Sequence, residues 1–351
     1  MKQIVKVFLL GAVLLATAIA YSQSQGPQYK KQESGIPVLT GFVGLGSEFE
    51  PGQQQVLPAI SPILLVPLGD HVLIESEAEF EGNYTHITGQ PWDHAWDKGI
   101  EYVQADVFVN KYLTLVGGRF LTPFGTFNER LHSGWIRNIQ AAPFVTAFEM
   151  TDSNGGMARG AVAVGRNLNI NYSGFYSASS DTAWFVSDRA AGGRVGLFFP
   201  NARFEVGSSY QRKIGDGRRD VYGVDWTWQL KSIPLDIRGE FAKDPAIGKG
   251  YWIEGAYRMR KVPFLKAFMQ KSQAEVRMEQ FWVSPLLTDA GDMEIPTNDA
   301  KRVFAGWSYW IRPAVRANFA AGREFNPVDG DHNVWTVGLT YRFAFPLWGG
   351  K

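Results

Sequence analysis

Apolar and polar residues alternate with a period of two near the end of the chain, where the pattern is clearest. One set of alternate positions holds Trp335, Val337, Leu339, Tyr341, Phe343 and Phe345, and the set between them holds Thr336, Gly338, Thr340, Arg342 and Ala344. Because successive side chains of a strand point to opposite faces, this segment has one apolar face and one small or polar face. A core could bury such an apolar face, whereas a membrane barrel turns it toward lipid.

The same alternation recurs along almost the whole chain and predicts sixteen strands. They are expected at 36–49, 54–66, 71–84, 99–109, 112–121, 157–165, 168–180, 191–199, 203–213, 220–230, 235–244, 250–259, 264–283, 300–311, 315–326 and 332–345. Tight turns, one of them at Arg260 to Pro263, alternate with longer loops. Pro58 and Pro62 cannot donate hydrogen bonds to a neighbouring strand, which leaves fourteen strands open as an alternative.

These patterns predict an all-β fold, a transmembrane antiparallel β-barrel of about sixteen strands with short periplasmic turns and long extracellular loops. The composition agrees, with 14% aromatic residues, 12 Trp and 38 Gly. No apolar stretch after residue 20 is long enough for a transmembrane helix, which needs roughly 20 residues. The balance of 35 basic and 34 acidic residues gives no indication of nucleic-acid binding.

The first 20 residues have the pattern of a cleaved secretory signal peptide. Lys2 and Lys6 precede an apolar run, and Ala18-Ile19-Ala20 fits a cleavage site. Residues 21–35 are expected to form a flexible leader, and 36–351 the barrel, located in the outer membrane. The chain has no Cys, which excludes a disulfide framework, a lipid-anchored cysteine and a thiolate metal site.

Ionisable side chains are expected on the lumen face, because an unpaired charge facing lipid costs about 2–4 kcal/mol at the bilayer midplane. Glu75, Glu77, Glu79 and Glu81 share one face of one strand and predict an acidic ladder along a water-filled pore. The other predicted pore-lining residues are Arg194, Arg203, Arg238, Glu240, Glu254, Arg258, Arg316 and Arg342. Arg119 instead shares its face with Leu113 and Leu115, so a bulge that flips the register is expected at Gly117-Gly118.

The third loop, 122–156, is the longest connection and is rich in aromatic residues. Long loops in compact domains are usually functional or disordered, and the aromatic content argues against disorder. The loop is expected to fold into the barrel and narrow the pore, with Glu129, Arg130, His132 and Arg137 contacting solutes. The alternative is that it lies across the outer rim.

Signs of catalysis are weak. The five His residues form no Ser-His-Asp relay, and no nucleotide or zinc-helix motif is present. No catalytic residue, cofactor or metal site is therefore expected, and loop groups such as Asp93, His94 and Asp97 are interpreted as solvated.

The segment from Glu101 to Gly125 resembles the strand–turn–strand that precedes the constriction loop in porins similar to the phosphate-selective O and P type. The last strand, with Gly338, Tyr341 and Phe343, resembles the C-terminal signal read by the barrel-assembly machinery. The resemblance implies a porin, and a homotrimer by resemblance alone. Two departures are that the chain continues past Phe345 to Lys351 and that loop 122–156 contains no Lys. Phosphate specificity is therefore not carried over.

Together these observations predict an outer-membrane porin that passively conducts small hydrophilic solutes or ions. The expected partners are outer-membrane lipid, the barrel-assembly machinery and the solutes. Two alternatives stay open: a non-conducting barrel that acts as a scaffold or adhesin, and an outer-membrane hydrolase that uses His132 or His94.

Overall fold

The computed structural model describes residues 35–148, 152–215, 218–287, 296–328 and 330–347. The predicted signal peptide, and the leader except for Gly35, lie outside these residues. No helix in the described part is long and apolar enough to cross a bilayer.

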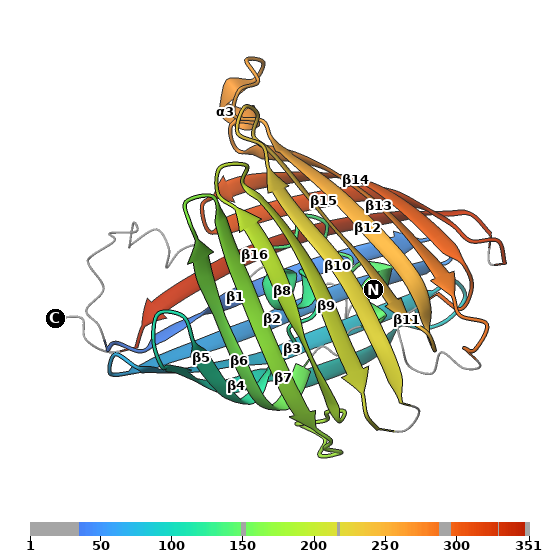
Figure 1. Ribbon diagram of the computed structural model, residues 1–351. Helices are drawn as coiled ribbons and strands as arrows, with labels where there is room; N and C mark the ends of the chain where they lie inside the picture. Colours follow the sequence, from blue (N-terminus) through green and yellow to red (C-terminus); the bar gives the residue numbers. More distant parts are fainter. Residues whose placement is uncertain (1–34, 149–151, 216–217, 288–295, 329, 348–351) are drawn as a thin grey trace.

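Sixteen antiparallel strands close into a barrel, in which each strand pairs with its neighbours in the sequence and β1 pairs with β16 (Figure 1). The strands are β1 Val38–Glu50, β2 Gln53–Leu68, β3 Val72–Ile87, β4 Asp93–Phe108, β5 Thr114–Leu121, β6 Asp152–Val164, β7 Leu168–Ala178, β8 Ala190–Phe199, β9 Phe204–Lys213, β10 Arg219–Gln229, β11 Leu235–Asp244, β12 Gly248–Arg258, β13 Ser272–Val283, β14 Ala300–Arg312, β15 Val315–Phe325 and β16 His332–Pro346. The predicted fold and strand number are confirmed.

The fourteen-strand alternative is wrong, because β2 pairs with β1 without interruption from Gln53 to Leu65 despite its prolines. On its other side, the pairing with β3 is interrupted between Val56 and Ala59 and again between Ile60 and Ile63. Pro58 and Pro62 lie in these two gaps. A proline has no N–H to donate, so the loss of pairing is confined to one edge of the strand.

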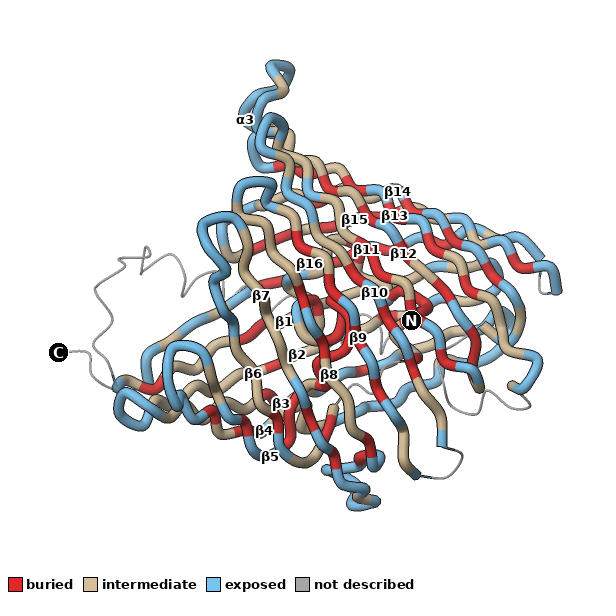
Figure 2. Tube along the Cα trace, viewed as in Figure 1, coloured by how far each residue is buried: buried red, intermediate tan, exposed pale blue. Residues whose placement is uncertain are grey.

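The two faces of the barrel differ in chemistry as the alternation predicts. On the outer face, apolar side chains such as Val195, Val276 and Val337 are about half exposed, at 51%, 56% and 48%. The residues buried along the strands (red in Figure 2) include inward-facing charged groups such as Arg277 and Glu279. The barrel thus has a polar interior and an apolar exterior.

Three strand boundaries differ from the prediction by five residues or more. β4 begins at Asp93 rather than 99, and β6 at Asp152 rather than 157, so the third loop is shorter, 122–151. The predicted tight turn at Arg260 to Pro263 is wrong: the connection runs from 259 to 271 and contains the short helix α3, Lys266–Met269. Residues 264–269 have no period of two. They form a helical turn whose Phe268 ring packs against Tyr309, and β13 begins only at Ser272.

A bulge occurs in β4 but not at the predicted place. Glu77 pairs with Tyr102 and the next residue, Ala78, with Ile100, so Glu101 is the extra residue. The pairing of β5 runs through 117–118 without a shift, so the predicted bulge there is wrong. Arg119 keeps the outer parity and is neutralised there by Asp152, while its Nε donates to the Ile100 carbonyl at 2.7 Å.

Candidate functional site

The described part of the third loop, 122–148, lies inside the barrel, with the helix α2 (Phe127–Leu131) and the 3-10 helix η1 (Phe144–Phe148). The backbone N–H groups of Thr126 and Phe127 donate to Glu240 on β11, at 3.1 and 3.2 Å. The N–H of Phe144 donates to Glu279 on β13 at 2.9 Å. Both carboxylates are buried on the inner parity of strands far from β5 and β6 in the sequence. The loop therefore crosses the lumen rather than the outer rim.

Apolar contacts fix the loop to one wall. Buried loop residues pack against buried residues of the wall and the adjoining connections, namely Phe124, Phe127, Leu131, Phe144, Val145 and Phe148 against Val221, Ala242, Ile247, Trp252, Phe281 and Ala300. Phe148 stacks on Phe281 at 5.5 Å between ring centroids, and Phe127 meets Trp252 edge-on at 6.2 Å. Burying a large apolar side chain stabilises the folded state by about 1.5–3 kcal/mol, so these contacts hold the loop in one defined position against the wall.

Predicted pore-lining residues take part in holding the loop. Asn138 donates to Glu254 at 2.7 Å and accepts a hydrogen bond from Gln273 at 2.8 Å. Glu254 also accepts from Arg238 at 2.8 Å. On β15, Arg316 donates to the Gly134 carbonyl at 3.1 Å. Glu240, Glu254 and Arg316 thus face the lumen but contact the loop.

The acidic ladder of β3 meets the loop at Arg137. Burial lowers the pKa of the Arg137 guanidinium, and the nearby carboxylates of Glu79, Glu81, Glu101 and Glu77 oppose this shift. Arg137 also donates to the carbonyls of Leu131 and His132. Glu77 is only 3% exposed, so part of the ladder is covered. The ladder and the loop form one electrostatic unit.

The bulge residue Glu101 extends this unit. The imidazole Nε2 of His132 lies 3.3 Å from a Glu101 carboxylate oxygen. Together with Glu79, these residues place one potential ligand atom each within 4.8 Å of the others. The contact between the His132 imidazole and the Glu101 carboxylate is made by protein groups alone, so the geometry does not require a metal ion.

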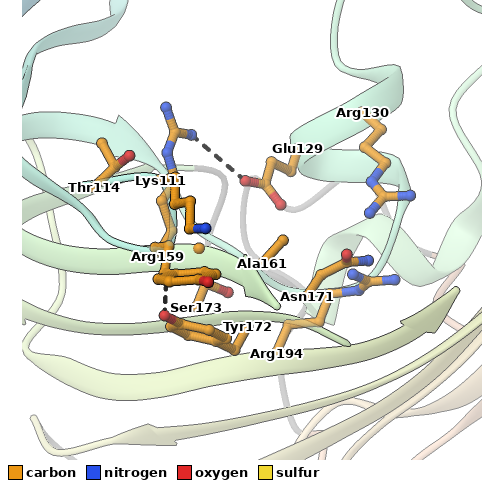
Figure 3. Close-up of a pocket in the computed structure, with 12 residues that line it drawn as sticks. Lys111, Thr114, Glu129, Arg130, Arg159, Ala161, Asn171, Tyr172, Ser173 and Arg194 are labelled. Atoms are coloured by element: carbon orange, nitrogen blue, oxygen red, sulfur yellow. Dashed lines mark hydrogen bonds and ion pairs between the residues drawn. The ribbon is translucent and has the colours of Figure 1, made fainter. Parts of the chain in front are cut away.

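A cavity of about 600 Å³ remains between the loop and the wall of β5 to β8 (Figure 3). Arg130 of the loop donates to both oxygens of Glu205, at 2.8 and 2.7 Å. Arg194 binds Asp225 at 2.6 Å and Glu205 at 3.0 Å. Arg159 pairs with Asp106 and lies 3.8 Å from Glu129. The cavity wall is therefore a network of alternating charges.

Three inward arginines on the opposite wall lie against tryptophans instead of carboxylates. Arg258 lies over the ring of Trp310 at 4.7 Å, and Arg342 over Trp135 at 5.8 Å. Arg316 contacts both rings, at 5.6 and 5.9 Å. Within the described ranges none of the three has a carboxylate within 4.0 Å, although Glu275 lies close enough to act electrostatically on Arg258 and Arg316.

The structure places one predicted residue outside the lumen and adds others to it. Arg203 is exposed in the turn between β8 and β9, at φ +51°, so it does not line the interior. Asp106 and Arg159 were not predicted, although both lie on the inner parity of regular strands. Glu101 could not have been found by parity, because the bulge changes the phase of β4 next to it.

No protein-family model and no curated protein matches the chain. Solved structures do match. OmpF of Salmonella typhi, in complex with daunomycin, has a TM-score of 0.58 and 13% identity, over 89% of this chain and 99% of that one. An anion-selective porin from Comamonas acidovorans has a TM-score of 0.56 and 11% identity, over 87% and 99%. OprB of Pseudomonas putida has a TM-score of 0.56 and 8% identity, over 89% and 93%. At such low identity the likeness extends to the fold alone: this chain has the fold of the outer-membrane porins.

Proposed function

We propose that the protein is an outer-membrane porin that passively conducts small hydrophilic solutes or ions. The observation that carries the proposal is a closed barrel with an apolar exterior, a charged interior and a loop docked inside it that leaves a lined cavity. In outer-membrane barrels such an interior is water-filled and such an exterior faces lipid. The loop sets the size limit, and the charges on the two walls act on the passing solute.

The lumen charges suggest how solutes are sorted. The carboxylates of β3 and β4 lie on one side of the loop, and Arg258, Arg316 and Arg342 lie on β12, β15 and β16. A solute between them experiences a field across its path, which orients dipolar molecules. The arginines resting on Trp135 and Trp310 form the side that attracts anionic groups.

A non-conducting scaffold is the second candidate, because the loop is anchored by both apolar and polar contacts across the lumen. The hydrolase reading has less support. His132 is paired with Glu101, and in the described part of the chain no serine or threonine hydroxyl is hydrogen-bonded to its ring.

Planar-bilayer recording of the purified protein tests the proposal. We expect stepwise conductance, and a larger step after deletion of residues 126–140, since this segment occupies the lumen. The control deletes residues 181–186 of the connection between β7 and β8, a segment that ends at Val186, whose carbonyl accepts a hydrogen bond from Arg119. This control should leave the conductance step unchanged. A folded protein that remains silent in the bilayer would favour the scaffold.

Export and assembly belong to the same proposal. Cell fractionation should place the protein in the outer membrane, with Tyr21 as its first residue after removal of the signal peptide. One structure of similar fold, OmpT of Vibrio cholerae, was determined in a trimer form. We propose a homotrimer for this chain, which cross-linking in the membrane would show as a threefold increase in mass.

A further inference from the structure

The connection 259–271 differs from the other turns at its end of the barrel. Those turns lie at 69–71, 109–113, 165–167, 200–203, 230–234 and 313–314, and all are shorter. In Figure 1 the segment with α3 stands out from the barrel, and Figure 2 shows it largely exposed. Three of its apolar side chains are exposed: Phe264 is 68% exposed, Leu265 59% and Phe268 42%.

The base of the connection leans on the outer face of the barrel. The Phe268 ring stacks on Tyr309 at 4.9 Å and on Trp307 at 6.0 Å. Both aromatic residues share the parity of Val303, which is 39% exposed on the outer face. Ser272 also donates to the Phe268 carbonyl at 3.0 Å. The segment thus continues the outer aromatic surface and does not enter the lumen.

The charge of this segment is one-sided. It contains four cations, Arg260, Lys261, Lys266 and Lys271, and no acidic residue, in a chain of formal net charge +1. In the part of the chain that the structure describes, none of the four has a carboxylate within 4.0 Å. Lys261 donates only to the Ser232 carbonyl, at 3.1 Å. These four side chains are therefore free to bind anionic groups outside the chain.

The backbone at the apolar tip is also unusual. Leu265 has φ +44° and ψ +48°, the left-handed region that branched residues rarely adopt. At Leu265 the backbone conformation and the exposure of the apolar side chain to water both raise the free energy. Insertion of the tip into an apolar phase removes the cost of exposing the side chain to water.

We propose that the connection 259–271 is an interfacial anchor that binds anionic phospholipid in the periplasmic leaflet. Phe264 and Leu265 enter the acyl region, and the four cations contact lipid phosphates. Apolar residues combined with basic ones, beside a lipid-facing surface, are the features of segments that lie in a membrane interface. The inference needs the barrel in a bilayer but does not depend on conduction, which the bilayer recording measures separately.

The absence of native Cys permits a direct test of depth. Phe264→Cys carries a nitroxide label, and the protein is reconstituted into vesicles of phosphatidylethanolamine and phosphatidylglycerol. We expect the label to be accessible to oxygen and protected from a water-soluble nickel chelate. Leu286→Cys, 71% exposed in the connection between β13 and β14 at the other end, is the control and should show the opposite. Equal nickel access at both positions would overturn the proposal, as would spin–spin broadening at 264, which would indicate a second copy of the chain.

The charge requirement has its own matched variants. In Lys261→Gln/Lys266→Gln/Lys271→Gln, the ratio of phosphatidylglycerol to phosphatidylethanolamine retained after detergent extraction should fall at least about fivefold, the effect of one lysine beside an anionic surface. Lys98→Gln/Lys249→Gln/Lys301→Gln removes as many charges at the other end and should leave the ratio unchanged. An equal ratio in both variants would refute specific binding of anionic lipid.

Discussion

Gly125 lies in the third loop shortly after β5 and has a φ of +62°. Single residues with such a backbone conformation determine how the loop packs inside the barrel. The backbone N–H of Gly125 donates to Ser209 at 2.9 Å. A Cβ placed on Gly125 would lie 1.7 Å from a carboxylate oxygen of Glu240, the residue that holds the next two N–H groups. No other residue fits this position without moving Glu240.

Gly125→Ala should therefore release the start of the loop. Gly165→Ala is the control, because Gly165 has a similar φ of +67° but no atom within 4 Å of its Cβ position. The left-handed backbone costs about 1–2 kcal/mol in both variants. Denaturant titration in vesicles should show a larger loss for Gly125→Ala, and bilayer recording an increase in conductance noise in that variant alone. Equal losses would mean that Glu240 does not hold the loop.

Loss of Arg194 should lower the stability of the cavity wall. Arg194 binds two buried carboxylates, and although Arg130 still pairs with Glu205 in Arg194→Gln, the buried charge of Asp225 is left uncompensated. Removal of one partner from a buried pair costs about 3–5 kcal/mol. Arg323→Gln removes an arginine from an exposed pair with Asp331 and should cost about 0–1 kcal/mol. The free energy of unfolding of the two variants would coincide if the cavity wall were freely hydrated.

Among the elements, β3 carries the clearest electrostatic assignment. Replacement of Glu75, Glu77, Glu79 and Glu81 by Gln should shift the reversal potential toward anions, because four carboxylates leave one wall. Arg258→Gln/Arg342→Gln removes positive charge from the inner faces of β12 and β16 and should shift the reversal potential toward cations. A reversal potential that is unchanged in both variants would remove the proposed role of the lumen charges.

Elements with uninterrupted alternation could be predicted from the sequence, and elements whose phase changes could not. β16 shows this, because its apolar side chains from Trp335 to Phe345 lie on the face that the pattern indicates. In β4, Glu101 is an extra residue that has no partner in β3, and this bulge brings it toward the lumen. The alternation within β4 alone does not reveal a bulge, because the bulge depends on how β4 pairs with β3. Residues 264–271 were misread as strand because short apolar runs have no period that separates helix from strand.

The placement of the third loop shows a similar limit. Its aromatic content argued against disorder, and insertion into the barrel was expected, with the outer rim as the alternative. However, the carboxylates that hold it, Glu240, Glu254 and Glu279, lie on strands far along the chain. Glu240 and Glu254 were predicted only as pore-lining residues, and Glu279 was not among the predicted site residues. These carboxylates hold the loop only because particular loop residues lie opposite them, and that arrangement is determined by the closure of the barrel and not by any one strand.

For the whole molecule, the surroundings of the two faces are the decisive property. Val195 lies on the outer face of β8 and Asn171 on the inner face of the adjacent β7, where its side chain donates to Glu205. Val195→Lys should lower the free energy of unfolding in vesicles by about 2–4 kcal/mol, the cost of a charge facing lipid. Asn171→Lys should cost much less, since a lysine there has water and Glu205 as partners. Equal effects would contradict a lipid-facing exterior.

The pairing of β1 with β16 joins the first strand of the sheet to the last. During synthesis the partner of β1 is therefore the final strand to emerge, and until then both ends of the growing sheet expose unpaired N–H and C=O groups. Such edges recruit other strands and lead to aggregation. A chain that lacks residues 332–346 therefore cannot close the barrel in this way and keeps two open sheet edges.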